Sequence, residues 1–141
     1  ARDGNRIGGG DWAGFVQYWV RNTGSDPWER VESIEVGSRV YWTDMDESVT
    51  VVIIGFQGHG PRLYELGDSS LTLLWSANEG VDGGQRSIAI TPNGEYISAM
   101  TRGGGGGGGQ IIVYNREGEI VFTQRGRGDR GERKTRGRGG W

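Results

Sequence analysis

The chain has 141 residues, which suits a single modest core, and its 29 glycines are about three times the share of ~7% that is usual. Glycine loses more backbone freedom on folding than any other residue, so this composition argues against a mainly helical protein. The formal net charge is −2, but residues 125–141 carry seven Lys or Arg against two Asp or Glu, which leaves −7 for residues 1–124. Such a body repels nucleic acid and anionic membranes, so only the tail could attract them. The lack of cysteine excludes disulfides and thiolate sites, and no apolar run approaches the ~18 residues that span a bilayer.

The N-terminal part of the chain carries the weakest strand pattern. Residues 5–10 form a candidate strand, residues 11–14 a turn, and residues 15–21 a second strand rich in aromatic and branched side chains. The polar segment 22–30 then interrupts the pattern. We expect residues 1–30 to contain the C-terminal half of a first four-stranded unit and a linker.

A fuller unit is expected between residues 31 and 85. Its four candidate strands are residues 31–36, 48–55, 62–66 and 71–75. The second of them has a Val-Val-Ile-Ile centre that is apolar enough to be buried on both faces. Residues 37–47 separate the first two strands, and we interpret them as an inserted loop in place of a tight turn.

The best-patterned unit spans residues 86–124. Ser-Ile-Ala-Ile at 87–90 alternates as a half-buried strand should, and Thr-Pro-Asn-Gly at 91–94 is a strong turn signal. Proline presets φ at such a turn, and Asn-Gly accepts positive φ at little cost. Three more strands are expected at residues 96–100, 110–114 and 119–124. The unit is therefore predicted to be a four-stranded meander, followed by a basic Arg/Gly-rich tail at 125–141.

The sequence also resembles a known repeat. Residues 87–97, Ser-Ile-Ala-Ile-Thr-Pro-Asn-Gly-Glu-Tyr-Ile, resemble the strand–turn–strand of WD40-like and PQQ-like β-propeller blades, and residues 115–120 resemble the turn and final strand that follow. The likeness covers residues 31–124 well and 5–21 loosely. The Trp-Asp signature of strict WD40 blades is absent, which favours the looser PQQ-like group. The resemblance implies an all-β chain of consecutive four-stranded antiparallel meander blades, about two and a half in number.

So few blades cannot close a ring, because propellers typically have at least four. We therefore expect the chain to be either a part of a longer propeller or a short array of blades that further copies of the chain or partner proteins complete. Open sheets would otherwise leave apolar faces uncovered. The leading hypothesis is a non-catalytic binding or scaffold module, without a cofactor, that mediates protein–protein contacts or self-assembly. The alternatives are a fragment of a PQQ-like oxidoreductase, with an extracytoplasmic or cell-surface location, and a carbohydrate-binding propeller lectin.

Three carboxylates lie within four residues of the expected inserted loop, at Asp44, Asp46 and Glu47. Calcium favours oxygen-rich loops, which makes these residues candidate metal ligands. Their spacing lacks the alternating ligands and the glycine of an EF-hand loop, so a solvated acidic loop is the competing interpretation.

The tryptophans in turns and loops are candidates for ligand binding, because aromatic faces stack on sugar rings and flat cofactors. They are Trp12, Trp28 and Trp42. His59 is a further candidate, and as the only histidine it excludes a site with several histidines. Core packing for the tryptophans and a water-facing turn for His59 are the competing interpretations.

The basic tail resembles Arg-Gly-rich RNA-binding segments, in which guanidinium groups pair with phosphates and stack on bases. The candidate nucleic-acid contacts are Arg127, Arg130, Arg136 and Arg138. A solvated tail is the competing interpretation, and protein partners are favoured over nucleic acid because the body is acidic.

Overall fold

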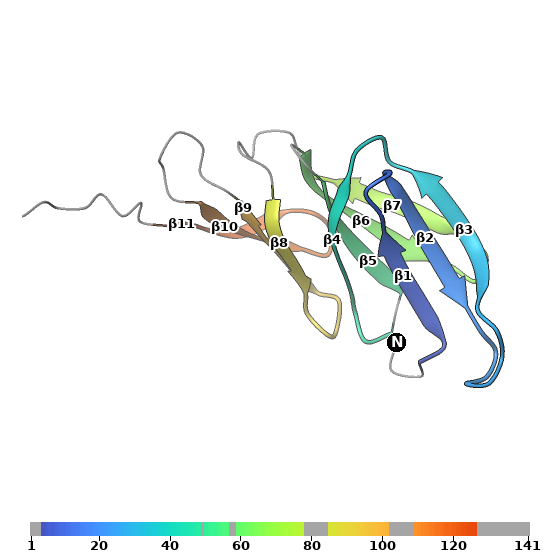
Figure 1. Cartoon of the computed structure of the whole chain (residues 1–141). Helices are drawn as coiled ribbons and strands as arrows, with labels where there is room; N and C mark the ends of the chain where they lie inside the picture. The colour runs from blue at the N-terminus through green and yellow to red at the C-terminus, as the bar shows by residue number, and fades with distance from the viewer. Residues whose placement is uncertain (1–3, 49, 57–58, 78–84, 102–108, 127–141) are drawn as a thin grey trace, which may run out of the picture.

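The computed structural model describes residues 4–48, 50–56, 59–77, 85–101 and 109–126. Within these ranges the chain is all β, with eleven strands in three antiparallel sheets and no helix that is long and apolar enough to cross a membrane. The sheets stand side by side in chain order, blue, then green, then yellow to brown (Figure 1). The prediction of an all-β chain built from antiparallel meanders is confirmed.

The strands follow one another in the chain as simple meanders. The first sheet contains β1 (Arg6–Gly10), β2 (Phe15–Val20) and β3 (Glu29–Glu35). The second contains β4 (Val40–Met45), β5 (Val51–Phe56), β6 (His59–Leu66) and β7 (Leu71–Ser76). The third contains β8 (Gln85–Ile90), β9 (Tyr96–Thr101), β10 (Gln110–Asn115) and β11 (Ile120–Arg125).

The third sheet has the strands and turns that the sequence predicts. The β8–β9 turn closes with a 2.8 Å hydrogen bond from the Gly94 amide to the Thr91 carbonyl, and Gly94 has a φ of 72°. The β10–β11 turn closes with a 3.0 Å bond from the Gly118 amide to the Asn115 carbonyl. Both turns are short and local, which is why their residues identify them in the sequence.

A strand does form at residues 31–35, but its assignment to the second sheet is wrong, and so is the inserted loop at residues 37–47. Glu29–Glu35 do not open the second sheet but form β3 and pair with β2, with Ile34 opposite Val16. Residues 37–47 are not an inserted loop, because Val40–Met45 form β4, which pairs with β5. The start of β4, Val-Tyr-Trp-Thr, consists of good strand formers, but the acidic residues that follow made the segment resemble a loop.

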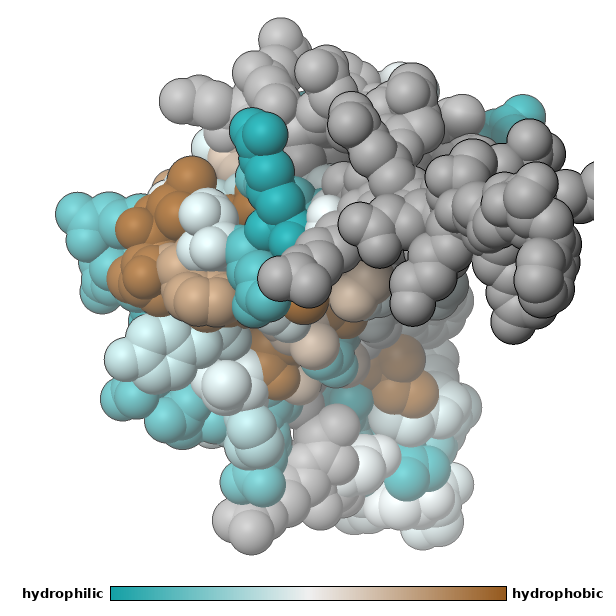
Figure 2. Space-filling model, turned by 90° about the vertical axis from the view of Figure 1, so that its left-hand side faces the viewer, coloured by the Kyte–Doolittle hydropathy of each residue, from teal (hydrophilic) through white to brown (hydrophobic). Residues whose placement is uncertain are grey.

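Among the described residues, the first and third sheets are each covered on one face, whereas the second sheet buries side chains on both of its faces. Val52 and Tyr64 of the second sheet pack toward the first sheet, and Val51 and Leu63 pack toward the third. The outer face of the third sheet has no neighbour among the described residues. Figure 2 looks at the molecule from this end, where apolar residues in brown lie exposed.

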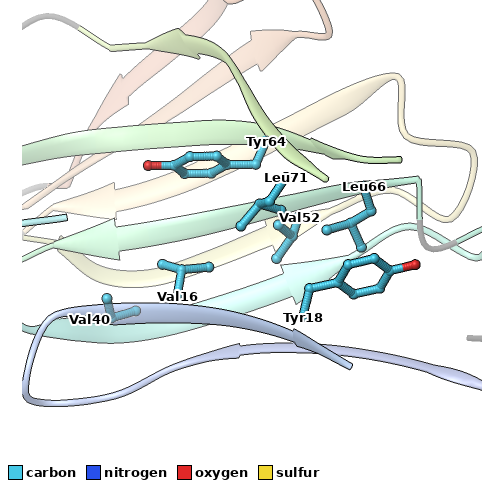
Figure 3. Close-up of a cluster of buried hydrophobic side chains, with 7 residues drawn as sticks. All are labelled: Val16, Tyr18, Val40, Val52, Tyr64, Leu66 and Leu71. Atoms are coloured by element: carbon cyan, nitrogen blue, oxygen red, sulfur yellow. The ribbon is translucent and has the colours of Figure 1, made fainter. Parts of the chain in front are cut away.

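The core between the first two sheets shows how neighbouring sheets pack. Seven buried side chains meet there (Figure 3): Val16, Tyr18, Val40, Val52, Tyr64, Leu66 and Leu71. The inner face of β1 contributes glycines instead of side chains. A Cβ on Gly8 would lie 3.1 Å from the Met45 sulfur, and a Cβ on Gly10 would overlap the Val40 side chain. The glycines of β1 therefore let β4 pack directly against its backbone.

Candidate functional site

The acidic segment at the end of β4, residues 44–47, links the second and third sheets. Asp44 Oδ2 accepts a 2.9 Å hydrogen bond from the backbone amide of Ile90. The Glu47 amide donates a 2.9 Å bond to the carbonyl of Pro92. In each of these two bonds the donor and the acceptor are more than forty residues apart in the chain. The segment therefore joins two sheets and is not merely a solvated loop.

Asp46 is almost completely buried within the same segment, with 5% of its surface exposed. Its two carboxylate oxygens accept hydrogen bonds from Thr50, at 2.9 Å from the backbone amide and 2.8 Å from the hydroxyl. Such bonds satisfy a buried carboxylate without a metal ion. The described residues contain no group of three or more His, Asp or Glu that could hold a metal ion. A metal role for Asp44, Asp46 and Glu47 stays a prediction to which the geometry adds no support.

Trp12 stands at the tip of the β1–β2 turn with 69% of its surface exposed. Two side chains from the start of the second sheet surround it: Tyr41 meets its ring edge-on at a centroid distance of 6.0 Å, and the Arg39 Cζ lies 5.5 Å from its ring centroid. The turn is fixed to the same segment by a 3.1 Å hydrogen bond from the Val40 amide to the Asp11 carbonyl. This arrangement holds an exposed indole and a guanidinium close together.

The other candidates do not join Trp12 in one site. Trp42 lies in β4 and not in a loop, and 46% of its surface is exposed. Trp28 follows the far end of β2, partly buried, where the Arg21 guanidinium covers its ring at 4.6 Å. His59 begins β6 opposite Phe56. The tail candidates, Arg127, Arg130, Arg136 and Arg138, lie outside the described residues.

The largest set of exposed apolar side chains in adjacent strands lies on the outer face of the third sheet. Directly opposite residues of paired strands share a face, so Met100, Ile111 and Gln124 lie on one side of the sheet, together with Val113 and Phe122. Ile97, Ala99, Ile112 and Tyr114 face the second sheet, which places the first set on the outside. We call Tyr96, Met100, Ile111, Val113 and Phe122 the outer apolar face; all but Val113 are at least 38% exposed.

The covered side of the same sheet is tightly packed. Burial raises the pKa of the Tyr114 phenol above its ordinary value. The ring of Tyr114 lies 5.5 Å from that of Trp75 in the second sheet. One side of the third sheet is thus packed against the second sheet, while apolar side chains on its other side are exposed.

The first sheet has a smaller exposed apolar area on its outer side. Ile7 and Trp19 are opposite one another there, and Ile7 is 46% exposed. A shallow hollow of about 230 Å³ is lined by these two residues and by Gly9, Gly10, Asp11 and Gln17. Both ends of the stack of sheets therefore present apolar surface.

Sequence reasoning did not single out the residues of these two faces. One signal was available: the segment Gln-Ile-Ile-Val-Tyr of β10 is apolar at successive positions, which is typical of a strand buried on both faces. In the structure only Ile112 and Tyr114 are buried, and Ile111 is exposed. The outer apolar face is therefore recognised by apolar residues that the pattern predicts to be buried and that the structure leaves exposed.

Comparisons with known proteins agree with this architecture. No protein-family model matches the chain, and no curated protein matches it in sequence. Among solved structures it is similar to the β-propeller domain of Cps50 (Swd1) from Myceliophteria thermophila, with a TM-score of 0.69 and 18% sequence identity. The match covers 86% of this chain and 38% of that one, so the chain spans well under half of the propeller chain it matches. At this identity the likeness shows the fold alone: the sheets are blades of a β-propeller.

Proposed function

We propose that this chain is a non-catalytic β-propeller module that binds other polypeptides, and that the outer apolar face of the third sheet is its contact surface. The observation that carries the proposal is the exposure of Met100, Ile111 and Phe122 in three neighbouring strands. Burying one such side chain contributes roughly 1.5–3 kcal/mol, so a partner that covers all three gains substantial binding free energy.

The shape of the surface favours a polypeptide over a small ligand. A small ligand needs a concave site with a few convergent polar groups. The outer apolar face is instead the surface of a four-stranded sheet, and the equivalent surfaces inside this chain are covered by another sheet. Sheets pack face to face at about 10 Å with interdigitated side chains. A blade-like sheet, from a second copy or from another protein, is the occupant that suits it.

A sugar-binding function has one observation in its favour. Trp12 offers an exposed indole beside Arg39 and Tyr41, and an aromatic face of this kind can stack on a sugar ring. The oxidoreductase alternative gains no comparable support from the contacts of the described residues. The polypeptide-binding proposal rests on the larger surface.

A photo-crosslinking experiment tests the proposal in the cell that makes the protein. The photoreactive residue p-benzoylphenylalanine replaces Phe122 in one variant and Thr123 in a matched control. Thr123 is the adjacent, exposed residue that pairs with the buried Ile112 and so faces the other side of the sheet. We expect crosslinked peptides, identified by sequencing, from position 122 and few from position 123. Equal crosslinking from both positions, or none from either, would contradict the proposal.

A further inference from the structure

The three sheets do not have the same number of strands. The second and third have four each, and the first has three. In the two complete sheets the first strand of the chain pairs only with the second, as β4 pairs with β5 and β8 with β9. Strand direction tells which of the four places in the first sheet is not filled by a described strand.

The first strands of the two four-stranded sheets, β4 and β8, run in the same direction. Asp44 near the end of β4 accepts a hydrogen bond from Ile90 at the end of β8. By contrast, Val40 at the start of β4 donates its hydrogen bond to Asp11, which directly follows the end of β1. β1 therefore runs opposite to β4, as β5 does, and takes the second place in its sheet.

The turn before β1 supports the same assignment. Gly4 lies two residues before β1 with a φ of 67°, and Gly94 lies two residues before β9 with a φ of 72°. Positive φ at this place is what a tight strand-to-strand turn needs. β1 is thus entered in the way that β9 is, and the place of β8 has no counterpart among the described residues.

The backbone of β1 is ready to pair on this side. Arg21 donates to the Asn5 carbonyl and Asp11 to the Phe15 carbonyl, which sets the alternation of hydrogen-bonded pairs along β1 and β2. Ile7 and Gly9 therefore direct their N–H and C=O groups toward β2. Arg6, Gly8 and Gly10 direct theirs toward the opposite edge, which no described strand pairs with and which we call the free edge.

The side chains of β1 leave this edge accessible. Three of its five residues are glycines, so few side chains beside this edge hinder an approaching backbone. Glycine in a strand marks a place where another backbone can approach closely. The strand also lacks proline, and its one charged residue, Arg6, stands at its start.

We propose that the free edge of β1 is a strand-acceptor site that takes one extended polypeptide segment, antiparallel to β1, at the place that β4 and β8 fill in the other sheets. The occupant is a strand with small and branched apolar residues in alternation, like Ser-Ile-Ala-Ile of β8. This proposal rests on the proposed function, because the ligand is again a polypeptide. The contact differs, since the ligand forms backbone hydrogen bonds with the edge of β1 and does not cover the outer apolar face.

Hydrogen–deuterium exchange of single amides tests the proposal with the full chain. The probe is a synthetic peptide with the sequence of residues 85–91, Gln-Arg-Ser-Ile-Ala-Ile-Thr, and its control carries Asp in place of both isoleucines. A second arm joins residues 85–93 ahead of residue 4 in place of residues 1–3. We expect the amides of Arg6, Gly8 and Gly10 to exchange at least about tenfold more slowly in at least one arm, because each gains a hydrogen bond.

The controls make the outcome specific. The amides of Ile7 and Gly9 already pair with β2 and should not change, and the Asp-containing peptide should protect nothing. Protection by the free peptide identifies a strand from a separate chain as sufficient, and protection only in the joined protein identifies a connected strand as necessary. Unchanged exchange at Gly8 and Gly10 in both arms would overturn the proposal. Phe122→Asp, which disrupts the outer apolar face, should leave this protection intact, so the two proposals fail separately.

Discussion

The indole Nε1 of Trp75 donates a 2.8 Å hydrogen bond to the carbonyl oxygen of Arg116. This bond joins β7 of the second sheet to the β10–β11 turn of the third, and the indole also lies against Gly118, where an added Cβ would fall 2.8 Å from a ring carbon. Together with the Asp44–Ile90 bond it ties both edge strands of the second sheet, β4 and β7, to the third sheet.

Trp75→Phe should destabilise the protein by about 1 kcal/mol or more. The substitution removes the hydrogen bond to Arg116, with a net worth of about 0.5–1.5 kcal/mol, and part of the apolar contact. Urea unfolding, with the free energy of unfolding extrapolated to water, measures the loss. Trp12→Phe is the matched control, because Trp12 is 69% exposed and should lose less than about 0.5 kcal/mol. Equal losses in the two variants would show that the Trp75 contact contributes little.

Two adjacent glycines should respond very differently to alanine. Gly10→Ala places a methyl group where the Val40 side chain already lies, and overpacking of this kind costs about 1–3 kcal/mol. Gly9→Ala meets no atom within 4 Å and should be close to neutral. The two melting temperatures, measured side by side, test the prediction. A Gly9→Ala variant as unstable as Gly10→Ala would mean that the packing of β4 on β1 is not as described.

Asp46→Ala should destabilise the protein by about 1–3 kcal/mol, because it leaves the Thr50 amide and hydroxyl without their acceptor. The added loss should be small when Thr50→Ala is already present, which a double-mutant cycle measures. Asp68→Ala, on the surface of the β6–β7 turn, is the control.

Calcium provides a further check on the same segment. Since both Asp46 oxygens accept hydrogen bonds from Thr50, adding calcium or a chelator should leave the melting temperature unchanged. A clear rise with calcium would support the metal hypothesis for Asp44, Asp46 and Glu47.

Alkaline pH should weaken the contact between the second and third sheets at Tyr114. The pKa of this phenol is raised by burial, so as the pH rises through the ordinary value the unfolded state loses its proton first. The unfolded state then binds fewer protons than the folded state, and the free energy of unfolding falls with pH until the folded-state pKa is passed. Unfolding curves of the wild type and of Tyr114→Phe between neutral and alkaline pH should therefore diverge, with the steeper fall in the wild type. Parallel curves would show that Tyr114 titrates alike in both states.

The sequence predicted the elements whose signals are local. The strands and turns of residues 86–124 could be assigned because Thr91-Pro92-Asn93-Gly94 defines a turn without reference to any distant residue. The place of β3 could not be assigned in this way. Its alternation suits pairing with either neighbour in the chain, and the contact that decides between them, Ile34 opposite Val16, is between distant residues.

For the candidate sites, too, the sequence predicted local features but not contacts between distant residues. That Trp12 is exposed could be anticipated from its turn, but its neighbours Arg39 and Tyr41 come from the start of another sheet. The acidic residues were visible in the sequence, yet the amide of Ile90 that Asp44 binds lies forty-six positions away. The consecutive apolar residues of β10 indicate that both sides of this strand are apolar, but they do not tell which side of the third sheet the neighbouring sheet leaves uncovered.

The second sheet, buried on both faces, has a consequence for how the molecule comes apart. In a linear array each blade is stabilised by its own contacts and by those with its neighbours, so a blade with two neighbours is the last to open. Fraying should therefore begin at the ends of the array and proceed inward. In limited proteolysis, the fragments that survive longest should be centred on residues 40–76, and covering either terminal blade should slow the first cuts and not the last.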